Sequence, residues 1–103
     1  MNAQLAQQLA WLSPQASVLK NMRRGLEKES LRMTPTGHLA QSIHPEGLGA
    51  ALTHPYITTD YSEALIELIT PATKSIDETL TFLEDLHSFT YQQLGDERLW
   101  LNS

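Results

Sequence analysis

The sequence has 103 residues, which is enough for one small domain and too few for two. Hydrophobic residues make up 41% and charged residues 18%, so a folded chain is expected rather than a disordered one. The formal net charge of -5 argues against nucleic acid as a partner, because phosphate contacts need a basic surface. There is no cysteine, which excludes disulfides and thiolate metal sites.

The amino terminus lacks the basic region and apolar core of a signal peptide. No apolar run approaches the roughly 20 residues that a membrane-spanning helix needs. We therefore expect a soluble, cytoplasmic protein without a membrane partner.

The first half of the chain predicts a short helix and then a hairpin. Leu5, Leu9 and Leu12 follow helical spacing, so a helix is expected over residues 2–12, ended by Ser13-Pro14. An extended segment with alternating charge follows up to residue 33. The sequence Thr-Pro-Thr-Gly at 34–37 is typical of a turn, and residues 38–40 are expected to return as the second strand.

The middle of the chain is less regular. Residues 45–52 are expected to form one or two helical turns with Pro45 at the first position, although two glycines weaken this prediction. Residues 56–61 are β-prone and polar, which indicates a strand or an extended loop. Residues 64–70 form the most apolar run, and their β-branched side chains favour a buried strand over a helix.

The last part of the chain predicts a long amphipathic helix. Ser75 and Glu78 have capping-box spacing, and Gly95 is placed to end the helix. The apolar stripe expected to face the core consists of Ile76, Leu80, Leu83, His87, Tyr91 and Leu94. Residues 98–103 carry two large apolar side chains and no stop signal, so we expect the native chain to continue.

Two glutamates at alternate positions, Glu27 and Glu29, are the first candidates for chemistry. On a strand both carboxylates point the same way, about 6.6 Å apart, and repel by roughly 2.5 kcal/mol at an effective dielectric of about 20. Solvent, a divalent cation or arginine partners can offset this cost, and the nearby arginines are Arg23, Arg24 and Arg32. Alternating charge on a strand is most often a solvated face, so this pair alone does not predict a metal site.

Glu67 and Asp60 add to the same hypothesis. Glu67 interrupts an apolar run, and in a strand buried on both faces its carboxylate needs a partner or a metal ion; on a wet face it needs neither. Asp60 taken alone is typical of a turn or cap. Together with Glu27 and Glu29, these residues supply the hard oxygen ligands that Mg²⁺ or Mn²⁺ prefers.

Other common sites find no support in the sequence. The four histidines, His38, His44, His54 and His87, match no zinc spacing, and His87 is expected at the edge of the core. Phosphate-loop, dinucleotide-binding and nucleophile-elbow motifs are absent. A bound nucleotide would therefore be held through metal ions or by residues outside this chain, and no catalytic residue is assigned.

Residues 24–32, Arg-Gly-Leu-Glu-Lys-Glu-Ser-Leu-Arg, resemble the opening motif of bacterial glutamate–cysteine ligases of the proteobacterial type. Further similar stretches lie at 52–54, 57–71, 80–87 and 95–100, so the resemblance covers nearly the whole chain. It implies an α+β fold, with a partial antiparallel sheet and flanking helices, that forms the amino-terminal part of a glutamine-synthetase-like fold. Members of that family are several times longer, so residues 1–103 would be a single incomplete segment of a larger ligase catalytic domain.

The resemblance also implies a reaction. ATP would activate the γ-carboxylate of glutamate as an acyl phosphate, which the amino group of cysteine attacks to give γ-glutamylcysteine, the first step of glutathione synthesis. The motif residues Glu27, Glu29, Asp60 and Glu67 would then be ligands to magnesium ions around the ATP phosphates.

A second hypothesis stays open. A chain of this length would supply only part of the active site and is expected to be inactive alone. It could instead be a non-catalytic fragment that docks with a partner chain or self-associates through an unfinished sheet edge.

Overall fold

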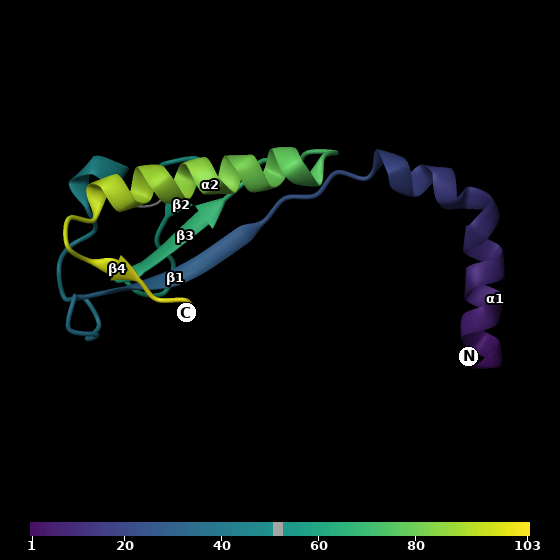
Figure 1. Cartoon of the computed structure of the whole chain (residues 1–103), viewed down its shortest axis with the longest axis horizontal. Helices are drawn as coiled ribbons and strands as arrows, with labels where there is room; N and C mark the ends of the chain where they lie inside the picture. Colours follow the sequence, from purple (N-terminus) through teal and green to yellow (C-terminus); the bar gives the residue numbers. More distant parts are fainter. Residues whose placement is uncertain (51–52) are drawn as a thin grey trace.

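The computed structural model describes residues 1–50 and 53–103. An arm, residues 1–22, projects from a body, residues 23–103, in which a sheet lies against one long helix (Figure 1). The molecule is elongated, with extents of 54 × 26 × 21 Å. The expected α+β class with a partial antiparallel sheet is confirmed.

The arm consists of helix α1 (Ala3–Leu12) and the 3₁₀ helix η1 (Ser13–Asn21). The Asn2 side chain accepts a hydrogen bond from the Leu5 amide at 2.7 Å and caps α1, so the predicted helix over 2–12 is confirmed. The chain was expected to leave helical geometry at Pro14. It continues as η1 instead, because proline fits the first turn of a helix.

Four strands form the sheet in the order β2-β3-β1-β4, with every neighbouring pair antiparallel. Strand β1 (Glu27–Met33) pairs with β3 (Leu65–Ile69), so the predicted strand in 64–70 is confirmed. Of the strand or extended loop expected at 56–61, only β2 (Ile57–Thr58) forms a strand. Strand β4 (Arg98–Leu99) was not predicted, since two residues carry too little periodicity to be recognised.

Two short features connect the strands. Met33 bridges to Leu39 across a turn that contains Gly37 at a φ of 85°, which confirms the predicted hairpin in a minimal form. The 3₁₀ helix η2 (Glu46–Leu48) follows Pro45, which precedes the helix rather than occupying its first position. The rest of the helix predicted at 45–52 lies partly outside the described residues.

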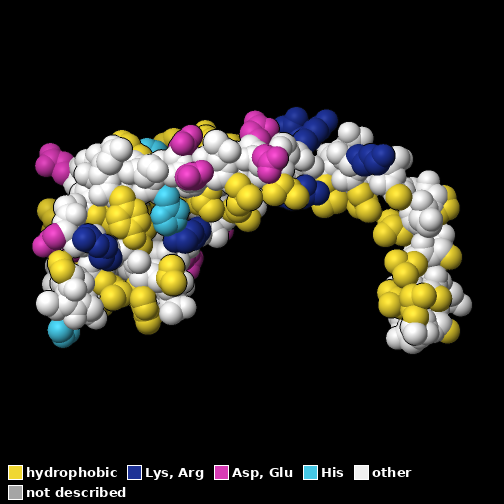
Figure 2. Space-filling view, viewed as in Figure 1, with side chains coloured by type: hydrophobic (Ala, Val, Ile, Leu, Met, Phe, Trp, Pro, Cys, Tyr) yellow, Lys and Arg dark blue, Asp and Glu magenta, His cyan; other side chains and the backbone are white. Residues whose placement is uncertain are grey.

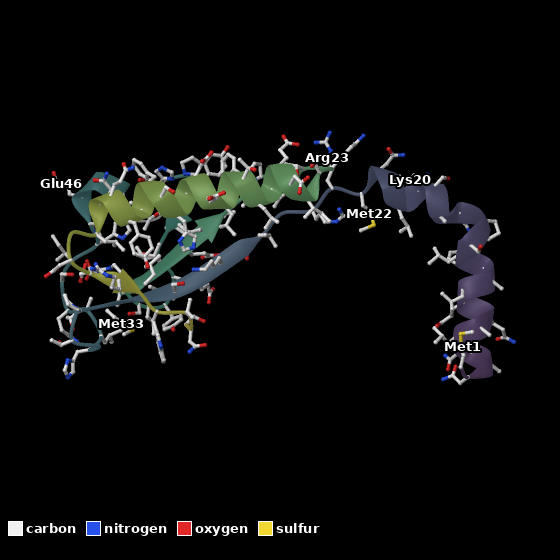
Figure 3. All side chains as sticks on the ribbon, in the orientation of Figure 1. Met1, Lys20, Met22, Arg23, Met33 and Glu46 are labelled. Atoms are coloured by element: carbon white, nitrogen blue, oxygen red, sulfur yellow. The ribbon has the colours of Figure 1, made fainter. Side chains whose placement is uncertain are left out.

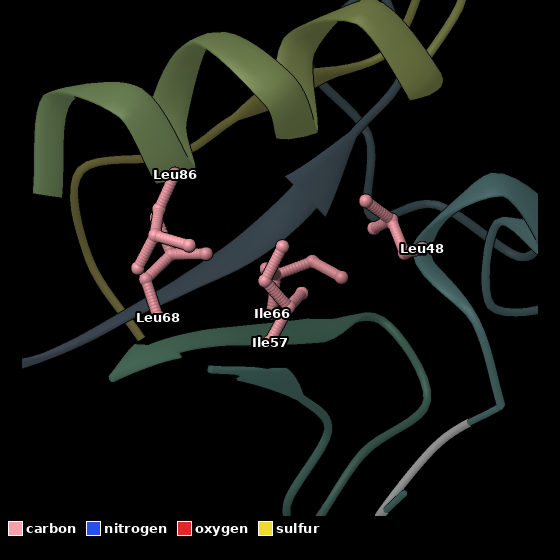
Figure 4. Packing of buried hydrophobic residues seen from close by; sticks show 5 residues of the cluster. All are labelled: Leu48, Ile57, Ile66, Leu68 and Leu86. Atoms are coloured by element: carbon pink, nitrogen blue, oxygen red, sulfur yellow. The ribbon is translucent and has the colours of Figure 1, made fainter. Parts of the chain in front are cut away.

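Helix α2 (Ile76–Gln93) covers one face of the sheet. The Ser75 hydroxyl accepts a hydrogen bond from the Glu78 amide at 3.3 Å, and Gly95 follows the helix at a φ of 66°, as predicted. The core lies between α2 and the sheet, and its buried cluster consists of Leu48, Ile57, Ile66, Leu68 and Leu86 (Figure 4).

The predicted apolar stripe of α2 is only partly correct. The helix faces the core with Thr79, Leu86 and Thr90, whereas Ile76 and Leu80 are 58% and 50% exposed. Burial of Thr79 is possible because its hydroxyl lies 2.6 Å from the Thr73 hydroxyl and 3.4 Å from the Arg24 carbonyl oxygen. Within the described part of the chain, no helix is both long and apolar enough to cross a membrane.

Candidate metal centre

The candidate carboxylates lie on the face of the sheet that α2 does not cover, called the open face below. Directly opposed residues of an antiparallel pair share a face, and Glu29 of β1 is opposite Glu67 of β3. Glu27 lies opposite Ile69 on the same face, two residues before Glu29. Strand pairing therefore places three acidic side chains on one side of two neighbouring strands.

Asp60 reaches the same place from the segment that follows β2. Carboxylate oxygens of Glu29, Asp60 and Glu67 lie within 4.8 Å of one another, close enough to share one metal ion. Glu29 and Glu67 are half-buried, and Asp60 is exposed. The structure thus brings together three of the four predicted ligands, with Glu27 beside them on β1 but outside the group.

The electrostatics of the group fit a cation. The pKa of Glu67 is raised above the ordinary glutamate value by partial burial and then by the negative charges of Glu27, Glu29 and Asp60. In the part of the chain that the structure describes, no salt bridge reaches Glu29, Asp60 or Glu67. A divalent cation would offset this mutual repulsion, and an all-oxygen donor set suits Mg²⁺ or Mn²⁺.

Arg32, one of the three arginines considered as possible partners for the glutamates, does not pair with them. Arg32 lies on the opposite face of β1, is fully buried, and pairs with Glu97 at 2.8 Å. Its Nη1 also donates to the Ser42 hydroxyl, and its Nη2 to the carbonyl oxygens of Ser42 and Glu63. The sequence held a signal for this arrangement, because Arg32 has the opposite strand parity from Glu27 and Glu29.

Arg32 also connects β1 to the segment that carries Asp60. Its backbone amide donates to the Ala64 carbonyl oxygen at 2.7 Å, and its side chain holds the Glu63 carbonyl oxygen at 3.1 Å. These bonds hold the backbone of residues 63–64, which lie between Asp60 and β3. Arg32 therefore connects β1 to the segment between Asp60 and β3, which the sequence did not suggest.

The covered face carries a second group of ionisable residues. Lys28 donates to the Ser30 hydroxyl at 2.8 Å, and burial lowers its pKa. The pKa of His87 is lowered by burial and by the charge of Lys28. The ring of His87 stacks on the ring of Tyr91, with the two ring centroids 6.1 Å apart. His87 is half-buried, as predicted for a histidine at the edge of the core.

Comparison with known proteins decides the family. The glutamate–cysteine ligase family profile matches residues 9–103. The chain belongs to the glutamate–cysteine ligase family. A relative from Yersinia pseudotuberculosis, a glutamate–cysteine ligase, is 58% identical over 92 residues, which are 89% of this chain and 18% of that protein.

Two solved structures share the fold. The glutamate–cysteine ligase from Francisella tularensis, solved in complex with AMP, matches 77% of this chain with a TM-score of 0.74 and 48% identity. A bifunctional glutathione synthetase from Pasteurella multocida matches 90% of this chain with a TM-score of 0.77 and 36% identity. The matched regions make up 16% and 13% of those chains, so this chain spans a small part of each relative.

Proposed function

We propose that this chain is the amino-terminal part of an ATP- and Mg²⁺-dependent glutamate–cysteine ligase. The reaction would join the γ-carboxylate of L-glutamate to the amino group of L-cysteine, giving γ-glutamylcysteine for glutathione synthesis in the cytoplasm. The observation that carries the proposal is the meeting of Glu29, Asp60 and Glu67 within 4.8 Å on the open face. The AMP bound to the Francisella tularensis relative supports a nucleotide as co-substrate.

Glu29, Asp60 and Glu67 would hold the metal ion, with Glu27 beside them as a further ligand. A divalent cation at this place would neutralise charge that develops on ATP phosphates during phosphoryl transfer. The chain contributes a rigid support, because β1 and β3 are hydrogen-bonded along the segments that carry Glu29 and Glu67.

The site would be completed outside this chain. Residues 1–103 would form a single incomplete segment of a larger catalytic domain, since the chain spans 18% of its Yersinia pseudotuberculosis relative. The pockets for ATP, glutamate and cysteine would then come mostly from the remaining part. We expect the chain alone to be inactive.

A chimera provides the test, with this chain in place of the matching region of the Yersinia pseudotuberculosis ligase. Phosphate release from ATP should require both glutamate and cysteine. Glu29→Gln or Glu67→Gln should lower kcat/KM at least about 100-fold, because each removes a metal ligand. Glu84→Gln, which removes an exposed charge from α2, should leave the rate unchanged. Full activity in the Glu29→Gln chimera would contradict the proposal.

The competing proposal is a non-catalytic fragment that self-associates. It is favoured by large apolar side chains left exposed, among them Trp11, Val18 and Leu101. Pairing of sheet edges is less favoured, because the edge strands β2 and β4 have only two residues each. Sedimentation of the lone chain separates the two proposals, since a monomer that persists at high concentration contradicts self-association.

A further inference from the structure

Asp60 is the least supported of the three carboxylates that meet on the open face. Glu29 and Glu67 are directly opposed on β1 and β3, which pair along the whole length of β3. Asp60 instead lies beyond the end of β2, an edge strand that pairs with β3 only at Ile57 and Thr58. The position of the Asp60 carboxylate therefore depends on what holds β2 in place.

The His54 ring supplies β2 with a hydrogen-bond acceptor from outside the sheet. Its Nδ1 accepts from the backbone amides of Tyr56 at 3.1 Å and Ile57 at 3.0 Å. Within the described part of the chain, no strand lies on the outer side of β2, so a side chain has to take this role. Ile57 is fully buried, and a buried amide that loses its acceptor destabilises its strand.

The ring of His54 is itself held in position. It packs edge-on against the ring of Tyr56, with the two ring centroids 6.4 Å apart, and Tyr56 packs edge-on against Phe82 of α2 with a centroid distance of 5.0 Å. Figure 2 shows hydrophobic side chains gathered along α2 where it faces the sheet, and Ile57 belongs to this buried layer. Because Nδ1 accepts, the neutral ring carries its proton on Nε2.

The segment that leads to His54 is anchored as well. The short helix η2 contacts α2, and Figure 3 shows Glu46 of η2 beside the carboxyl-terminal end of α2. Gly49 follows η2, and a Cβ at this glycine would lie 3.9 Å from the His54 ring. His54 is therefore backed by η2 and, through Tyr56, by α2.

We propose that His54 is a positioning residue for the metal centre. By accepting from the amides of Tyr56 and Ile57, it fixes β2 and so keeps the Asp60 carboxylate beside Glu29 and Glu67. The inference rests on the proposed metal function of these carboxylates and adds a residue outside the set of ligands. If His54 served only its local turn, its loss would lower stability and leave metal affinity unchanged.

Two amide substitutions isolate the acceptor. Asparagine can place its side-chain oxygen near the position of Nδ1, whereas glutamine carries its oxygen one bond further from the backbone. Mn²⁺ binding, followed by electron paramagnetic resonance, should be at least about tenfold weaker in His54→Gln and close to that of the unaltered chain in His54→Asn. His38→Gln makes the same change at an exposed histidine of the hairpin that follows Met33 and should leave the affinity intact.

A double-mutant cycle shows whether His54 acts through Asp60. Asp60→Asn alone should weaken Mn²⁺ binding at least about tenfold, because it removes a ligand. In that background His54→Gln should weaken binding by less than about twofold, since the carboxylate that it positions is gone. A His54 effect of the same size in both backgrounds would contradict the proposal.

Hydrogen exchange in the unaltered chain tests the same coupling without a substitution at His54. Because coupling between two sites is reciprocal, saturating Mg²⁺ should slow exchange of the Ile57 amide at least about fivefold. The same addition to Asp60→Asn should have little effect. An Ile57 exchange rate that Mg²⁺ leaves unchanged in the unaltered chain would contradict the proposal.

The outcomes separate this inference from the proposed function. Equal Mn²⁺ affinity in the unaltered chain and in His54→Gln would overturn the role of His54 alone, and so would an affinity in His54→Asn as low as that in His54→Gln. Failure of the unaltered chain to bind Mn²⁺ would overturn the proposed metal centre and, with it, the role of His54.

Discussion

Both the burial of Glu67 and the negative charges around it disfavour the ionised form of its carboxyl group. Its pKa is raised in the folded chain by partial burial and by the charges of Glu27, Glu29 and Asp60. Folding therefore favours the protonated form of Glu67. The stability that protonation contributes is fully present below the ordinary pKa of 4.5 and is lost as the pH rises through the raised value.

Glu67→Gln should consequently stabilise the lone chain at neutral pH, because it removes a carboxylate from a crowded acidic group. The gain should disappear below pH 4.5, where the native carboxyl is protonated as well. Urea denaturation at both pH values measures the effect, with Glu84→Gln as the control. A loss of stability at neutral pH would show that Glu67 has a favourable partner in the free chain.

Arg32 should be much less tolerant of change. Arg32→Met removes the cation that pairs with Glu97 and the donors to Ser42 and Glu63, so we expect a loss of about 3 kcal/mol in the free energy of unfolding. Chemical denaturation measures it. Arg32→Met combined with Glu97→Met should lose less than Arg32→Met alone, because no unpaired carboxylate remains. Equal losses would mean that the ion pair does not carry the effect.

The strands show what alternation in a sequence can and cannot predict. Parity alone indicates that Glu27 and Glu29 share a face of β1, and this is what the structure has. The position of Glu29 opposite Glu67 depends on a long-range register that no local pattern encodes. The pairing of Arg32 with Glu97 is equally long-range, which is why it was not predicted.

Helix α2 was predictable in extent because its end signals are local. Its rotation against the sheet was not, since Thr79 is buried through hydrogen bonds to Thr73 and Arg24 that only the folded chain provides. The apolar pattern showed that the helix is amphipathic. It did not show that part of the apolar face, at Ile76 and Leu80, would remain exposed.

The amino-terminal cap of α2 gives a prediction at the same scale. Ser75→Ala removes the hydroxyl that accepts from the Glu78 amide and should cost about 1 kcal/mol of stability. Ser75→Asp should retain most of it, because aspartate caps helices equally well. Thermal unfolding followed by circular dichroism compares the two variants, and identical midpoints would argue against a stabilising cap.

The whole molecule combines a compact body with an arm that contributes nothing to the body's core. Deletion of residues 1–22 should therefore leave the unfolding free energy of the lone chain nearly unchanged, since no residue of α1 or η1 is buried. Denaturation with urea measures this directly. A large loss would show that the arm packs on the body in solution.

At the scale of the whole molecule, we propose that the open face holds a divalent cation. Electron paramagnetic resonance of Mn²⁺ titrated into the lone chain at neutral pH tests it most directly, because bound Mn²⁺ loses the sharp signal of the free ion. We predict saturable binding that Glu29→Gln or Glu67→Gln weakens at least about tenfold and that Glu84→Gln leaves intact. Equal Mn²⁺ binding by all three variants and the unaltered chain would contradict the account.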